Sequence, residues 1–123
     1  MNGTVPVVDI NKFRDEIEVD NDTLKELYKI FIEELNQQKN LMRVQIESME
    51  LEELKKTIHN IKGISGNYKA LKVWDLSSKV YDELRDGEKN ESDLNNSIKK
   101  IENSIEDTID EINRILWRNS NAV

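Results

Sequence analysis

Residues 91–117 read ESDLNNSIKKIENSIEDTIDEINRILW and carry the most regular apolar pattern of the chain. Apolar side chains recur in it at steps of three and four residues, which places them along one side of an α-helix. The stripe consists of Leu94, Ile98, Ile101, Ile105, Ile112 and Ile115. Thr108 interrupts the stripe, and Ile109 and Leu116 broaden it. The pattern predicts a long amphipathic helix over residues 91–118 that buries one face against other helices.

Earlier segments of the chain carry stripes of the same kind. They predict long helices over residues 23–47, 49–66 and 69–85, and Asp9 can cap a short helix over residues 9–18. The apolar positions of the three long segments are Leu24, Leu27, Phe31, Leu35, Met42 and Ile46; Leu51, Leu54, Ile58 and Ile61; and Val73, Leu76, Val80 and Leu84. Tyr28 and Leu41 flank the first stripe, and Trp74 and Tyr81 widen the third.

Amphipathic helices joined by short loops bury one another most simply as a bundle. We therefore expect an all-α fold, an antiparallel up-down-up-down four-helix bundle with a short extra N-terminal helix. A length of 123 residues suits one domain, so residues 1–123 are expected to form a single unit.

Composition restricts the function classes. The formal net charge is −7, from 25 acidic against 18 basic residues, which disfavours nucleic acid as a partner. The sequence has no cysteine, one histidine, no signal-peptide pattern and no apolar run of bilayer-spanning length, so we expect a cytoplasmic protein without a structural metal or membrane segment.

The only histidine, His59, lies on the second long predicted helix and points away from its apolar stripe. Residues three and four positions away are its neighbours on the helix surface, namely Lys55, Lys56, Lys62 and Gly63. Three ammonium groups could offset the negative charge of a phosphoryl group on the ring. A glycine inside a helix costs up to about 1 kcal/mol relative to alanine, a cost that clearance for an approaching protein would explain. The alternative is that His59 is an ordinary solvated residue and that Gly63 only frays a helix end.

The segment HNIKGISGNYKA, residues 59–70, resembles the motif of the histidine-containing phosphotransfer (HPt) domain family. That motif is a histidine, any residue, an aliphatic residue, Lys-Gly, a small-residue stretch, Asn and then Gly-Ala. The order of helices resembles the family's over nearly the whole chain. The resemblance implies a four-helix bundle in which His59 accepts the phosphoryl group, Lys62 supports it and Gly63 leaves room for a response-regulator receiver domain.

The segment departs from the family pattern at three positions. Ile58 stands where alanine is common, Ile64 where a small residue is common, and Lys69 where the glycine of the Gly-Ala pair belongs. We expect Gly66 and Asn67 to shape the turn in place of Lys69. The departures leave the phosphoryl chemistry intact and affect partner specificity. Gly63, Ile64 and Gly66 are the expected receiver-docking residues, with Lys55 and Lys56 assisting Lys62.

No nucleotide-binding loop or second acid-base histidine accompanies His59. We therefore expect a phosphocarrier without independent turnover or cofactor, not an enzyme. Its phosphoryl donors and acceptors would be receiver domains and a hybrid or histidine kinase, and the magnesium and aspartate would belong to the receiver. A monomer is expected. Two alternatives stay open: a helical adaptor that docks on a receiver or kinase without carrying phosphate, and a scaffold module that associates through the helix at residues 91–118.

Overall fold

The computed structural model describes residues 6–87 and 90–118. Within these ranges the chain forms five α-helices and a short π-helix, and it forms no strand. The elements are α1 (Ile10–Ile17), α2 (Asn21–Glu47), α3 (Leu51–Asn67), α4 (Leu71–Asp86), α5 (Glu91–Asn113) and the π-helix η1 (Arg114–Arg118). The all-α class is confirmed, and the predicted helix ends lie within a few residues of the observed ones.

Short polar side chains begin three of the helices. Carboxylate or amide oxygens of Asp9, Asp20 and Asn90 accept hydrogen bonds from backbone amides in the first turns of α1, α2 and α5. With Asp20 as its cap, α2 starts at Asn21, two residues before the predicted start at residue 23. Gly87 ends α4 in the left-handed conformation, with φ of 69°.

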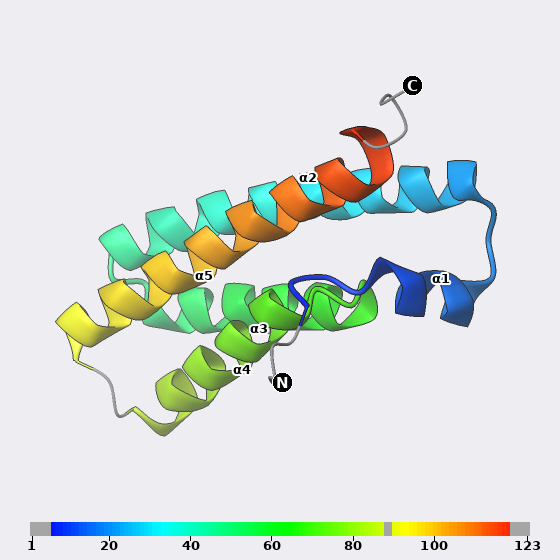
Figure 1. Cartoon of the computed structure of the whole chain (residues 1–123). Helices are drawn as coiled ribbons and strands as arrows, with labels where there is room; N and C mark the ends of the chain where they lie inside the picture. The colour runs from blue at the N-terminus through cyan, green and yellow to red at the C-terminus, as the bar shows by residue number, and fades with distance from the viewer. Residues whose placement is uncertain (1–5, 88–89, 119–123) are drawn as a thin grey trace.

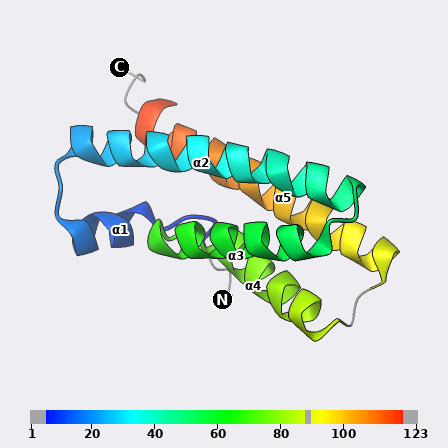
Figure 2. The ribbon, with the colours of Figure 1, turned by 180° about the vertical axis from the view of Figure 1, so that it is seen from behind.

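The four long helices pack around one another. α2 contacts α3 and α5, and α4 also contacts α3 and α5, so the four helices surround a common core. Figures 1 and 2 show that the chain reverses direction between successive long helices and that α1 lies near the end of α3. The segment before α1 is hydrogen-bonded to the α3–α4 turn, where the Asp9 amide donates to the Lys69 carbonyl (2.9 Å). No described helix combines the length and the apolar character that a bilayer crossing requires.

The core consists of the predicted stripes with a few exchanges. Leu41, Leu51 and Trp74 were expected inside or at the core margin, but they are 47%, 40% and 43% exposed. Tyr28, expected at a flank, is fully buried. Its burial is possible because its hydroxyl donates to the carbonyl of Tyr68 (2.7 Å), so no polar group is left unpaired.

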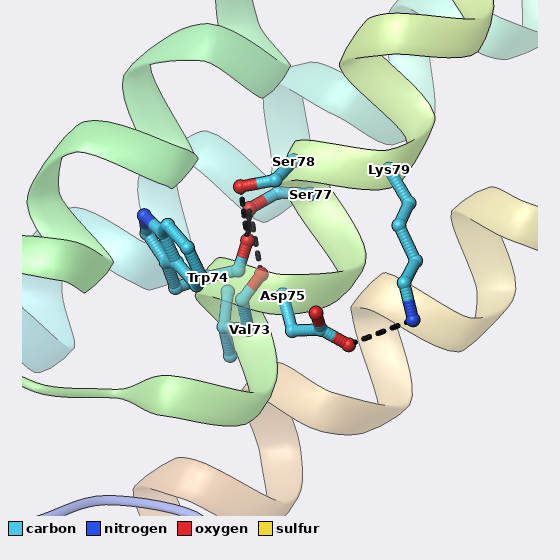
Figure 3. Close-up of polar contacts among 6 residues, drawn as sticks. All are labelled: Val73, Trp74, Asp75, Ser77, Ser78 and Lys79. Atoms are coloured by element: carbon cyan, nitrogen blue, oxygen red, sulfur yellow. Dashed lines mark hydrogen bonds and ion pairs between the residues drawn. The ribbon is translucent and has the colours of Figure 1, made fainter.

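Small hydroxyl side chains fill positions where α4 and α5 face the core. Ser77, Ser104 and Thr108 are fully buried, and each donates to a carbonyl of its own helix. Thr108 therefore interrupts the apolar stripe of α5 without leaving an unsatisfied donor. Figure 3 shows the hydroxyls of Ser77 and Ser78 turned toward the carbonyls of the preceding turn.

Candidate functional site

His59 lies on the solvent side of α3. The residues on the opposite side, Leu54, Ile58 and Ile61, are completely buried, whereas His59 is exposed. The helix continues beyond the histidine to Asn67, so the imidazole projects from regular helix rather than from a frayed end. The structure thus confirms that the ring points away from the core.

The nearest aromatic neighbour of the imidazole comes from α4. The ring centroids of His59 and Tyr81 lie 5.3 Å apart with an interplanar angle of 45°. The ammonium group of Lys62 lies over the same phenol ring, 5.9 Å from its centroid. The site therefore spans α3 and α4, and Tyr81, which the sequence placed only at the core margin, belongs to it.

The three lysines around His59 differ in their partners. Lys55 pairs with Glu52 (3.4 Å) and Lys56 pairs with Glu53 (3.6 Å) on the surface of α3. Lys62 has no carboxylate partner within residues 6–87 and 90–118, and its ammonium group contacts the ring of Tyr81 instead. Surface ion pairs of this type contribute little and exchange readily with solvent, but they reduce the field that Lys55 and Lys56 exert at the imidazole. Lys62 is consequently the cation most directly available to an anion on His59.

The glycines after His59 have different surroundings. A Cβ placed on Gly63 would meet nothing within 4 Å, so the helix surface one turn after the histidine is open. A Cβ on Gly66 would lie 3.1 Å from Cδ1 of Trp74. Gly66, predicted as a docking residue, thus also has a packing reason to be a glycine, because the indole of Trp74 lies against it.

Ile64 lies on the other side of α3 from the imidazole. It is half-buried and lines a shallow hollow between α2 and α3 with Ile30, Phe31 and Tyr68. Ile64 follows His59 by five residues, so the two side chains point roughly 140° apart around the axis of α3. His59 faces α4, and Ile64 does not. The structure therefore groups His59 with Lys62 and Gly63, and it places Ile64 on a different flank.

The turn between α3 and α4 differs from the expectation. Gly66 and Asn67 belong to α3, and Lys69 itself adopts the left-handed conformation, with φ of 61°. Its amide donates to the Gly66 carbonyl (3.3 Å), and its ammonium pairs with Glu16 (3.2 Å). The prediction that Gly66 and Asn67 shape this turn in place of Lys69 is wrong, because Lys69 takes the conformation that a glycine adopts most easily.

Other hollows offer less defined chemistry. The hollow between the first half of α2 and η1 is lined by Trp117 together with acidic and basic side chains, among them Glu26, Glu33, Lys25 and Lys29. Its mixed charges favour neither an anion nor a cation. Among the described residues, no group of three or more His, Asp or Glu side chains could hold a metal ion. No protein-family model, curated protein or solved structure matches the chain.

Proposed function

We propose that this chain is a histidine phosphotransfer protein that carries a phosphoryl group on His59 between aspartates of receiver domains. The observation that supports it best is the grouping on α3: an exposed imidazole, a lysine that pairs with no carboxylate of the described residues, and an open helix surface at Gly63. The proposal includes an antiparallel up-down-up-down four-helix arrangement of α2 to α5, with α1 as the extra N-terminal helix.

The transfer step is a displacement at phosphorus. The lone pair of an unprotonated ring nitrogen of His59 forms the N–P bond while the O–P bond of the partner's aspartyl phosphate breaks. The bonding electrons leave with the aspartate carboxylate, and the proton of the imidazole stays on its other ring nitrogen. The reverse step returns the phosphoryl group to an aspartate, so one histidine serves both donor and acceptor receivers.

Lys62 stabilises charge during this step. The transferring group spreads negative charge over its equatorial oxygens, and positioned cations stabilise it most where water is displaced. Lys55 and Lys56 assist less because each already has a glutamate partner.

The exposure of His59 allows a partner protein to reach the imidazole. The imidazole lies on a convex helix surface, where a partner's concave site can enclose it and exclude water. We infer that the receiver supplies the magnesium ion and the reacting aspartate and that a hybrid or histidine kinase supplies the phosphate. The chain then acts as a cytoplasmic monomeric carrier rather than as an enzyme with its own turnover.

Transfer from a receiver tests the proposal. A receiver domain is charged with acetyl phosphate, freed of donor and mixed with the chain; phosphate on the chain should be acid-labile and stable in base. Lys62→Ala should slow its appearance by about tenfold, as expected for loss of one charge-stabilising group. Lys56→Ala is the matched control and should change the rate by less than about twofold, because Lys56 is ion-paired and exposed. Equal effects of the two substitutions would remove the role assigned to Lys62, and absence of base-stable phosphate with every receiver tried would remove the proposed function.

A further inference from the structure

Tyr81 touches both groups to which the proposed function assigns chemistry. Its phenol ring lies 5.3 Å from the imidazole of His59 and 5.9 Å from the ammonium nitrogen of Lys62, measured to ring centroids. The contacts join α4 to the outer surface of α3. We propose that Tyr81 is a positioning residue that holds the acceptor and the supporting cation side by side, an inference that rests on the proposed function.

The contact with Lys62 restricts a side chain that otherwise has many rotamers. A lysine has four rotatable bonds, and Lys62 has no carboxylate in the described chain to fix its end. An ammonium group within about 6 Å of an aromatic centroid is attracted to the face of the ring. The ring of Tyr81 therefore keeps the ammonium on the α4 side of α3, the side that the imidazole also faces.

The contact with His59 restricts the acceptor. An exposed histidine samples several orientations about its two side-chain bonds, and only some present a ring nitrogen to an incoming phosphorus atom. The tilted contact at 45° removes the orientations that would overlap the phenol ring. Fewer unproductive orientations raise the fraction of encounters in which the nitrogen is in line with the breaking bond.

Tyr81 can restrict the side chains of His59 and Lys62 because its own backbone, in α4, is fixed by buried neighbours. Its chain neighbour Val80 is buried in the core, and Ser77, one turn earlier, is fully buried with its hydroxyl donating to the Val73 carbonyl (2.6 Å). Tyr81 itself is half-buried and packs against the core, and its ring contacts His59 and Lys62. A fixed backbone with a partly exposed ring is suited to positioning.

The contact can be tested without any partner, because the chain has a single histidine whose ring protons are resolved by NMR. The unmodified chain should show nuclear Overhauser effects between the ring protons of His59 and Tyr81. Tyr81→Leu should shift the His59 ring resonances, whereas Tyr81→Phe, which keeps the ring, should leave them almost in place. Trp74→Leu removes an exposed aromatic side chain from the same helix and should also leave them in place. Absence of the Overhauser effects in the unmodified chain would overturn the proposal even if Tyr81→Leu fails to fold.

The effect of Tyr81 on phosphoryl transfer is measured with phosphoramidate as the phosphoryl donor. The phosphoryl group forms a bond to an imidazole nitrogen as the P–N bond of the donor breaks and ammonia leaves. Tyr81→Leu should slow phosphorylation of His59 about three- to tenfold, and Tyr81→Phe less than about twofold, because the ring carries both contacts. In the Lys62→Ala background Tyr81→Leu should have a smaller effect, since part of its action passes through the lysine.

A failure of the role proposed for Tyr81 and a failure of the proposed function would give different results in these experiments. Equal slowing by Tyr81→Phe and Tyr81→Leu would overturn the role proposed for Tyr81, because the hydroxyl and not the ring would then act. Unchanged rates with both variants would also overturn it. If the unmodified chain accepts no phosphate from phosphoramidate or from receivers, the proposed function fails, whereas the Overhauser effects and resonance shifts still decide whether Tyr81 positions His59.

Discussion

Substitution of Gly63 by alanine should stabilise the protein. Gly63 lies inside α3, four residues before its end, and an added Cβ would meet nothing within 4 Å. Alanine is favoured over glycine in a helix interior by about 0.5–1 kcal/mol, and no steric cost opposes this gain here. We expect the free energy of unfolding to rise by about that amount and the melting temperature by about 2–5 °C.

Two other glycines serve as matched controls for this effect. Gly66→Ala gains the same helix propensity, but its Cβ would lie 3.1 Å from Trp74, so the indole must move and the gain should be smaller or absent. Gly87→Ala places a side chain in the left-handed conformation and should destabilise by about 1 kcal/mol. Urea denaturation followed by circular dichroism measures all three in one series.

A longer side chain at Gly63 tests the effect of this position on phosphoryl transfer. Gly63→Gln keeps helix propensity but fills the open surface one turn from the imidazole. Transfer from a phosphorylated receiver should therefore slow by about tenfold or more, because the receiver can no longer bring its aspartyl phosphate close to His59. Stability and transfer should then change in opposite directions. A Gly63→Ala variant no more stable than the parent would show that the helix surface at Gly63 is not open. A Gly63→Gln variant that accepts phosphate at the parental rate would show that the receiver does not approach there.

Further substitutions test the turn, the aromatic cluster and the core. Lys69→Gly should be about 1 kcal/mol more stable than Lys69→Ala by urea denaturation, because both lose the ion pair with Glu16 and only glycine relaxes the left-handed backbone. Burial raises the pKa of Tyr28, so the folded chain keeps a proton that the unfolded chain releases near pH 10; stability should therefore fall by up to about 1.4 kcal/mol per pH unit above about pH 10. Tyr28→Phe should remove that contribution to the alkaline loss but cost about 1–2 kcal/mol at neutral pH, since it leaves the Tyr68 carbonyl without its donor, which a pH series of denaturation curves would reveal. Ile101→Ala, at a fully buried position, should cost about 2–5 kcal/mol in the same denaturation assay, and a smaller cost would show a loosely packed core.

The helices could be predicted from sequence because each carries its own signal. The stripe at steps of three and four residues is a local feature, as are the polar caps of α1, α2 and α5 and the glycine that ends α4, and these sufficed for the all-α class. Individual burial was harder at the margins of the stripes. Leu41 and Trp74 lie where a stripe could widen on either side, and only the position of the neighbouring helices decides which side is covered.

The candidate site was predictable on α3 and not beyond it. The spacing of His59, Lys62 and Gly63 is fixed by helix geometry, so their place on one side of α3 followed from the sequence. Tyr81 could not be linked to them, because its place beside His59 depends on how α4 is aligned along α3. The conformation of Lys69 was missed because a lysine with left-handed backbone is uncommon. The conformational cost is offset by the hydrogen bond that the amide of Asp9, remote in sequence, donates to the Lys69 carbonyl.

Under the proposed function, His59 is the phosphoacceptor. The most direct test of this role is localisation of the phosphate by mass spectrometry at neutral to basic pH, after transfer from a charged receiver. We predict phosphate on the peptide containing His59, none on a His59→Gln variant, and an unfolding free energy for that variant within about 0.5 kcal/mol of the parent, because the side chain is exposed. Base-stable phosphate on the His59→Gln variant would show that another residue is the acceptor, and loss of its fold would make the histidine a structural residue.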